Sequence, residues 1–530
     1  MDMQELDERY REALSYKGRW LGLYQELYIY VIPNRDAFNV KFNYLDAAKP
    51  TFQNIYDDTA PLAAYERAND LHALLIPQDR NWGKVTMDTH MFRDDQVQQL
   101  KPRFDEMNER IMYFINQSNL ARVVNGSNLD LVGGTAALWI EHISEEIPIS
   151  FRSIPAVALY IEQTNDDLVE TAWYQINMSA RKIMNTFPKY KGKSLRALKD
   201  NPQEIHQVVF GQISIGEAGK EKYYIYAVLE NDPHEALWEV ERTYKQIIVY
   251  RDRVRPGEAD GRGIGLDLLP TIKDLNEMRK EARKDKATKA RPPMFYDNDK
   301  MFNPHAIRRW SGAMIARQPG GRNPIEALQM PTYPEVREEI LMMQDIIKKG
   351  FQVDPLGEIN NPVKTATEIS IRENRAQRTS STDISRLINE LPKQIYETVA
   401  KILNESLLLF KDRKPSDFPS FKKLRFDFQS PLYDIQKSEN IQKLAQAFQL
   451  KQQFFGEGSV MGSVNVGETN DYINDNLNIP SKLSKSKDEI NQIMDAVAKQ
   501  QAEAAQQQGM PTPSTSSSNV GLPKGTPQQF

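Results

Sequence analysis

The sequence predicts an α+β fold, with helices towards both ends of the chain and strands concentrated between residues 135 and 250. Apolar residues recur every three or four positions in residues 3–31, 59–75 and 95–118, which is the period of helices that bury one face. Short runs rich in β-branched and aromatic residues follow and are typical of strands. Long helical patterns return after residue 267, and the 30 prolines together with the strands oppose a coiled-coil scaffold.

The first half of the chain shows these patterns element by element. The helix at 3–31 is expected to end before Pro33, and the helix at 59–75 begins after the capping sequence Asp57–Thr59. The apolar stripe of the first helix consists of Trp20, Leu23, Tyr24, Leu27 and Tyr28, and that of the second of Ala64, Ala68, Leu71 and Leu75. Strands are expected at 135–140, 147–151, 158–161, 223–228 and 246–250.

The second half alternates long helices with loop-rich segments. A helix is expected from about Asp267 to Ala290, and Pro334 opens another that stops at Gly350, a natural residue after a helix end. The stripe of this second helix consists of Ile340, Met343, Ile347 and Phe351, which is more often core than contact surface. A helical region is expected from the capping box at Thr365 to about Phe410, kinked or divided by Pro392. A strand at 424–428, helices at 434–455 and 485–505, and a disordered tail from residue 506 complete the chain.

The composition is that of a folded globular protein. Hydrophobic residues make up 40% of the 530 residues, and the formal net charge is -4, whereas proteins that coat nucleic acid are strongly basic. At roughly 100–200 residues per domain, several structural units are expected. The absence of cysteine excludes disulfides and cysteine zinc sites. The charged N-terminal segment predicts no signal peptide, and no apolar run of about 18 residues predicts a membrane helix.

The sequence contains no motif for catalysis, a metal or a cofactor. The glycine run Gly261–Gly265 has neither the GxxxxGK[ST] nor the GxGxxG spacing, so a simple loop is expected. The segment HISEE from His142 is better explained as a solvated turn than as a metal site, and the acidic pairs at 57–58 and 166–167 as caps and turns. We therefore expect no catalytic residue, no metal and no cofactor, and a protein that is not an enzyme.

The helix at 267–290 carries two unlike faces. At about 100° per residue, four basic side chains project in nearly the same direction, namely Lys273, Lys280, Lys284 and Arg291. The opposite side carries Leu268, Leu275, Met278 and Ala282. Two interpretations stay open: a solvated surface helix, or a ladder of positive charge for a polyanion, with Glu277 close to the basic face.

Five segments, taken together and in order, resemble the portal proteins (head-to-tail connectors) of podovirus-type bacteriophages. They are IYDDTAPLAAYERANDLHALLIP at 55–77, GGTAALWIE at 133–141, FRSIP at 151–155, GRGIGLDLLPTIKDLN at 261–276 and TATEI at 365–369. The resemblance extends over roughly residues 5–450. The family often carries a Tyr-Gly-Arg-Gly-Pro-like run where this chain has Asp260 before the glycines and Ile264 among them.

This resemblance implies a portal fold with a mixed α/β wing, a two-helix stem, a small α/β clip and a helical crown. By position, the wing takes 1–262 and 365–432, the stem 263–290 and 334–350, the clip 291–333, the tunnel loop 351–364, the crown 433–505 and the disordered tail 506–530. It also implies a homo-oligomer, usually a dodecamer, at one capsid vertex of the virion, assembled in the host cytoplasm. Repeated around an axis, the stem helices would pack on neighbouring subunits through Leu268, Leu275, Ile340 and Met343.

In such a ring, double-stranded DNA passes non-specifically during packaging and ejection. The terminase large subunit and later the tail adaptor proteins would dock on the clip, and major capsid and scaffold proteins would assemble around the ring. The basic face of residues 273–291 would line the DNA channel. The tunnel loop would contact DNA through Asp354, Gly357, Glu358, Asn360, Asn361 and Lys364. Docking on the clip would use Arg308, Arg309, Trp310, Arg317 and Arg322, since arginine and tryptophan are enriched at interfaces, although Trp310 filling the clip's own core is an equal alternative.

Three other classes of protein fit the sequence less well than a portal protein. Another structural protein of the neck or tail, such as an adaptor or collar subunit, would usually be shorter and would lack two long helices around an irregular insert. A DNA-processing enzyme would need a metal, nucleotide or nucleophile motif, and the sequence has none. A coiled-coil scaffold is opposed by the prolines and strands.

Overall fold

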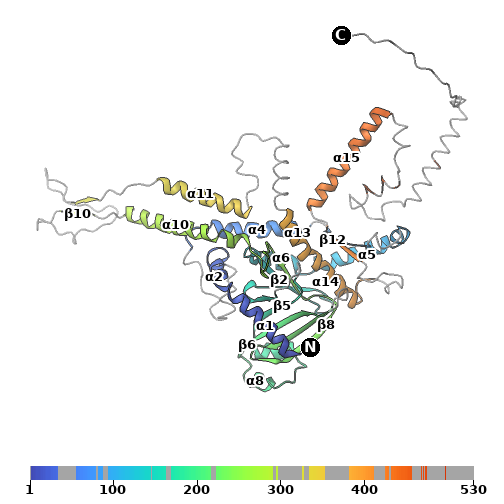
Figure 1. Ribbon diagram of the computed structural model, residues 1–530, viewed down its shortest axis with the longest axis horizontal. Helices are drawn as coiled ribbons and strands as arrows, with labels where there is room; N and C mark the ends of the chain where they lie inside the picture. The colour runs from blue at the N-terminus through green and yellow to red at the C-terminus, as the bar shows by residue number, and fades with distance from the viewer. Residues whose placement is uncertain are drawn as a thin grey trace, which may run out of the picture. The chain divides into compact units, whose positions relative to one another are not determined.

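In the computed structural model the chain divides into two compact units, Met1–Pro431 and Leu432–Phe530 (Figure 1). The structure describes residues 2–33, 55–78, 81–87, 94–144, 146–162, 169–215, 222–290, 294–296, 325–327, 334–352, 381–410, 424–428, 431–455 and a few isolated positions between 467 and 496. In the second unit the main described element is the long helix α15 (Pro431–Phe455). None of the helices in these ranges has the length and apolarity that a membrane crossing needs.

Two antiparallel sheets form the centre of the first unit. The larger has the order β4-β5-β6-β7-β8, with β4 (Leu159–Ile161), β5 (Ala172–Ser179), β6 (Ile205–Ser214), β7 (Tyr223–Leu229) and β8 (Asp232–Arg242). The smaller has the order β3-β2-β9, with β3 (Ser150–Ile154), β2 (Thr135–Glu141) and β9 (Ile247–Arg251). A 3-10 turn (Ala156–Ala158) separates β3 from β4. One apolar core, with Trp139, Ile225 and Val249 among its members, contains buried residues from both sheets.

Helices cover these sheets on several sides. The larger sheet packs on one side against α1 (Met3–Gly18), and another core joins it to α7 (Ala180–Thr186) and α8 (Leu195–Asp200). The largest core contains residues of α4 (Thr59–Leu75), α5 (Asp94–Gln117), α6 (Leu120–Leu131), α13 (Ser381–Glu390) and α14 (Pro392–Glu405). It also takes in the ribbon β1 (Gly83–Met87) with β12 (Leu424–Phe428), whose strands are far apart in the sequence.

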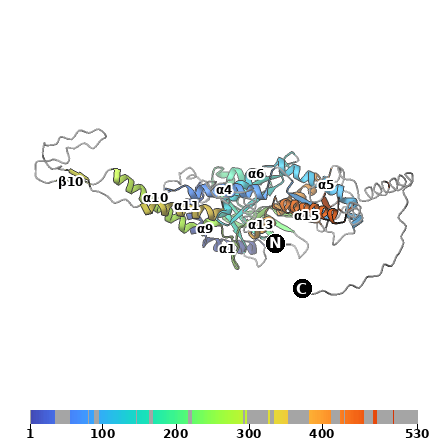
Figure 2. The ribbon, with the colours of Figure 1, turned by 90° about the horizontal axis from the view of Figure 1, so that it is seen from above.

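A further core holds two long helices together. These are α10 (Leu269–Ala290) and α11 (Pro334–Phe351), which pack with α2 (Leu21–Tyr30) and α4, while the short α9 (Ile264–Asp267) precedes α10. Both views show α10 and α11 side by side (Figures 1 and 2). Beyond their ends, β10 (Met294–Tyr296) and β11 (Ile325–Ala327) form a small antiparallel pair.

Most sequence-predicted elements are present, and the α+β class is confirmed. The prediction of a single helix at 3–31 was wrong, because this segment forms two helices separated at Arg19 and Trp20. Gly18 weakens the helix there, and Trp20 is buried with the Arg262 guanidinium 5.0 Å from the centre of its ring. Leu23, predicted on the buried stripe, is exposed. The strand expected at 147–151 begins only at Ser150, and Ile147 is exposed.

The ends of the later helices also differ from prediction. Gly350 lies inside α11 and not after it, and it packs closely on Leu268: a Cβ there would come within 2.6 Å of the Leu268 Cδ1. Gln352, with φ of 59°, takes the left-handed conformation instead. Pro392 divides the helical region as predicted, at Leu391, but the helix ends at Glu405 and not near Phe410. Residues 365–380, the helix at 485–505 apart from one position, and the tail lie outside the described residues.

Candidate functional site

The helix pair α10 and α11, named the stalk, carries the candidate site residues that the structure describes, Lys273, Lys280 and Lys284. Its base is buried: Leu275 of α10 and Ile340 and Ile347 of α11 are at most 5% exposed within the core of the same chain. The expectation that Leu275 and Ile340 pack on a neighbouring subunit is therefore wrong. These residues pack on α2 and α4 of their own subunit, since those helices already supply the apolar partner. Beyond Ala282, by contrast, α10 is mostly exposed.

One carboxylate joins both stalk helices to the rest of the unit. Asp57, just before α4, accepts a hydrogen bond at Oδ2 from the Arg279 Nε of α10 at 2.9 Å and from the Gln344 Nε2 of α11 at 2.7 Å. Its Oδ1 accepts from the backbone N–H of Thr59 at 3.0 Å. Burial by itself would raise the pKa of Asp57, but these hydrogen bonds from Thr59, Gln344 and Arg279 outweigh it and leave the pKa below its usual value.

Asp57→Asn should therefore loosen the stalk. We expect a loss of about 1–3 kcal/mol, the range for hydrogen bonds to a buried charged group, seen as faster amide hydrogen exchange in α10 and α11. Because the folded-state pKa is lowered, the native protein should hold this contact fully above about pH 4 and lose it as the pH falls further.

The variant should lack this acid dependence, and exchange in β5–β7 should not change. Asp58→Asn is the matched control, because the Asp58 side chain is exposed and makes no capping hydrogen bond. Equal effects of the two substitutions on the stalk would contradict the role given to Asp57.

The described lysines of the basic face predicted for α10 each form an ion pair with a carboxylate. Lys273 Nζ donates to Glu26 of α2 at 3.1 Å, Lys280 pairs with Glu277 at 3.0 Å and Lys284 with Glu281 at 2.6 Å. The hydrogen bond that Lys280 donates to Glu277, the largest cause, raises the pKa of Lys280. Arg291 lies outside the described residues. The face is thus a row of ion pairs, which lowers its net positive charge.

Two other cations on α10 were missed by the sequence argument. Arg283 and Lys286 are exposed and, within the described part of the chain, no carboxylate forms an ion pair with either. The sequence does contain a signal that these two cations are unpaired. Lys280 and Lys284 each have an acidic residue three positions earlier on the same helix face, whereas Arg283 and Lys286 have none three or four positions earlier. The candidate clip residues 308–322 and the candidate tunnel-loop residues 354–364 all lie outside the described residues.

Between β9 and the stalk, the backbone around Gly261 and Gly263 packs directly against the backbone before β2. A Cβ on Gly134, whose φ is +111°, would lie 2.2 Å from the Gly261 carbonyl oxygen, and one on Gly263 would lie 2.1 Å from the Val132 oxygen. The Asp252 N–H donates to the Gly134 carbonyl and the Gly261 N–H to Thr135 Oγ1. The glycine run is thus a structural junction: Gly261 and Gly263 lie in a loop as predicted, but Gly265 lies in α9.

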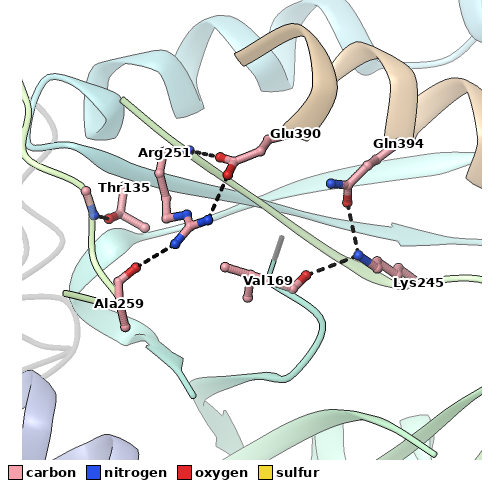
Figure 3. Close-up of polar contacts among 8 residues, drawn as sticks. Thr135, Val169, Lys245, Arg251, Ala259, Glu390 and Gln394 are labelled. Atoms are coloured by element: carbon pink, nitrogen blue, oxygen red, sulfur yellow. Dashed lines mark hydrogen bonds and ion pairs between the residues drawn. The ribbon is translucent and has the colours of Figure 1, made fainter. Parts of the chain in front are cut away.

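Two buried ion pairs fix the same region. Glu390 at the end of α13 accepts from the Arg251 guanidinium at 2.8 Å and from the Arg251 backbone N–H at 2.6 Å, and Arg251 also donates to the Ala259 carbonyl (Figure 3). Burial raises the pKa of Glu390, and Arg251 opposes this shift. Lys17 of α1 pairs with Asp260 at 2.7 Å, both nearly without exposure. Asp260 is one of the two residues, with Ile264, at which the sequence departs from the portal pattern, and Lys17 is its buried partner.

Close by, Lys245 lies between two further elements. Its ammonium donates to the Val169 carbonyl at 3.1 Å and reaches Gln394 Oε1 of α14 at 3.5 Å (Figure 3). Among the described residues there is no group of three or more histidine, aspartate or glutamate side chains that could hold a metal. The His142 ring contacts the Pro148 carbonyl at 2.7 Å, in agreement with a turn.

Residues 3–484 match the family described as bacteriophage head to tail connecting protein. The chain belongs to this family. As a member, the connector is a structural protein of the virion with a role in joining head to tail. No curated protein matches its sequence.

Solved structures resemble the connector only distantly. A chain in the virion of a native gene transfer agent (GTA) particle is 9% identical, with a TM-score of 0.37 and coverage of 75% of this chain and 88% of that chain. A chain from the neck of an empty GTA particle, computed with C6 symmetry, is 10% identical, with a TM-score of 0.37 and coverage of 80% and 92%. A chain from the neck of a native GTA particle, computed with C12 symmetry, is 11% identical, with a TM-score of 0.35 and coverage of 74% and 88%. These likenesses are too distant to carry an argument about this chain.

Proposed function

We propose that the connector is a portal subunit, which forms a closed ring of about twelve copies around a channel for double-stranded DNA. The ring would occupy one capsid vertex, and DNA would pass through it during packaging and ejection. The clip at 291–333 would dock the terminase large subunit and then tail adaptor proteins, while capsid and scaffold proteins assemble around the ring. Family membership supports the connector role, and the stalk is the observation that carries the proposal of a ring.

The stalk supports a ring because α11 also carries large apolar side chains that the described residues of its own chain leave exposed. On α11, Leu341, Met342 and Ile346 are exposed, away from the buried Ile340 and Ile347, and the ion pair between Asp345 and Lys349 lies among them. Large apolar side chains gathered on one exposed helix face mark an interaction site. A neighbouring subunit would cover this face, and an interface that joins different surfaces of two copies closes into a ring when the rotation permits.

The ion pairs on α10 support a channel that lets DNA slide. Lys273, Lys280, Lys284 and Arg291 would face the channel, and each described member has a carboxylate beside it. Contacts to phosphate read no sequence, and strong ones hold DNA in place. Paired lysines around a ring would therefore give weak contacts that do not depend on sequence, as the tunnel loop at 351–364 would also do.

Electron microscopy of the purified connector, combined with mass measurement, tests the ring. Wild-type protein should form closed rings of about twelve subunits with a central channel. Met342→Glu should shift the protein to monomers that remain folded, because a charge at this exposed position opposes the interface and breaks no contact within the subunit core. Ile205→Glu, at an exposed position of β6, is the matched control and should leave rings intact.

Other outcomes would contradict the proposal. Filaments, or a compact monomer with nuclease or ATPase activity, would refute a portal ring. Rings unchanged by Met342→Glu would refute the interface on α11. A small assembly that only binds to a preformed ring would instead indicate an adaptor or collar subunit.

A further inference from the structure

A cleft of about 610 Å³ lies away from the stalk, where the two central sheets meet the end of α14. Aromatic side chains make up much of its lining: Trp139, Tyr174, Phe187, Phe210, Trp238 and Tyr244. Trp139 and Phe210 pack edge to face at 5.1 Å. The cleft is therefore a preformed recess in the first unit, in which aromatic side chains of both sheets stand beside polar and charged ones.

Two buried polar atoms in the cleft lack hydrogen-bond partners in the described structure, and one is an acceptor while the other is a donor. Gln246 is 6% exposed and its Oε1 accepts no hydrogen bond, while the Arg242 Nε–H donates none. The Gln246 backbone is fixed, since its N–H donates to Gln212 Oε1 and its carbonyl accepts from Ile140. A buried donor or acceptor without a hydrogen-bond partner destabilises the fold. A peptide backbone would offer both a donor and an acceptor.

The charges of the cleft favour an acidic ligand. Arg152 pairs with Glu141 and Arg242 with Glu405, so each of these cations has a carboxylate beside it. Lys182, at the exposed rim, pairs with no carboxylate among the described residues. The charged side chains that line the cleft therefore have a net charge of +1, and Lys182 is the cation without a paired carboxylate among them.

Two exposed apolar residues directly follow residues of the cleft lining in the sequence. Ile143 follows the lining residue His142, and Leu407, which is 85% exposed with φ of 57°, follows the lining residue Ser406. A large aliphatic side chain that is held in the left-handed region and in water is unfavourable on both counts. A bound chain would cover it.

We propose that this cleft binds an extended segment of a partner protein, in which a large apolar side chain stands next to an acidic residue. The apolar side chain enters the aromatic recess, the segment's backbone satisfies Gln246 and Arg242, and its carboxylate pairs with Lys182. Extended peptides are bound in this way, with backbone hydrogen bonds for affinity and a pocket for specificity. The inference does not depend on the proposed channel, because the cleft shares no residue with the stalk.

Selection from a bead-bound library of random dodecapeptides, with the full-length connector as bait, tests this inference. We expect enriched peptides to share a large apolar residue within two positions of an Asp or Glu. The best of them, labelled with fluorescein, should bind at least tenfold more weakly to Lys182→Glu, which reverses the charge at the rim. Binding should also weaken at least tenfold with Thr186→Trp, which fills the cleft from an exposed position.

Two neighbouring substitutions control for indirect effects. Lys189→Glu and Asn185→Trp make the same changes at exposed positions outside the cleft lining and should leave the affinity within twofold of wild type. Unchanged melting temperatures would show that all four variants are folded. Failure to enrich any shared sequence, or equal binding by all variants, would overturn the proposal. So would self-association that is lost in Thr186→Trp, since the occupant would then be a second copy of this chain.

Discussion

Gly134→Ala should destabilise the first unit by about 2–6 kcal/mol, with unfolding in urea as the measurement. Two costs combine. A side chain at φ of +111° strains the backbone by about 1–3 kcal/mol, and its Cβ, 2.2 Å from the Gly261 carbonyl oxygen, forces a displacement that costs about 1–3 kcal/mol. The obstacle is backbone on both sides, so no side chain can rotate away to make room.

Gly257→Ala separates these two costs. Gly257 also has a positive φ, +82°, but a Cβ there would meet nothing within 4 Å. It should lose only about 1–2 kcal/mol, the cost of left-handed backbone for a residue with a side chain. Equal losses in the two variants would show that the contact between Gly134 and Gly261 contributes nothing.

Glu390→Ala should destabilise the first unit by about 3–5 kcal/mol, because it leaves the Arg251 guanidinium buried without its carboxylate. The two side chains are 5% and 1% exposed, so water cannot replace the lost partner. Unfolding in urea, followed by tryptophan fluorescence, measures the loss.

Glu405→Ala is the matched control for this substitution. Glu405 also pairs with an arginine, Arg242, but both side chains are more than a third exposed. Exposed pairs contribute at most about 1 kcal/mol, so the control should be nearly neutral. A loss at Glu390 no larger than that at Glu405 would contradict the importance of the buried pair.

Local patterns predicted much of this fold. The helices α4, α5, α10 and α11 were predicted to within a few residues because each repeats an apolar face along its own length. Pro392 was predicted to divide its helix because proline removes a donor wherever the chain places it. The errors arose where a distant contact decided the outcome. Leu268 packs on Gly350 across the stalk, and no local pattern at Gly350 reveals this.

The polar contacts that fix the stalk could not have been predicted from one sequence. Asp57 reaches a residue 222 positions away, Lys17 one 243 away and Arg251 one 139 away. In sequence, Asp57 fits a helix cap, and the structure shows that it does bond Thr59 but also holds both stalk helices. The lysine pairs of α10 were different, since Glu277 and Glu281 stand three residues before Lys280 and Lys284 and were open to prediction.

The ion pair between Arg251 and Glu390 also bears on how the length of the chain can differ between members of the family. It joins the last residue of β9 to the last residue of α13, so the chain between them leaves the sheets and returns at one point. An insertion between β10 and β11, whose ends that strand pair already holds together, is thermodynamically inexpensive, since doubling the length of a flexible loop costs only about 0.6 kcal/mol. Related chains could therefore carry longer or shorter insertions between β10 and β11 while the sheets and their helices stay the same.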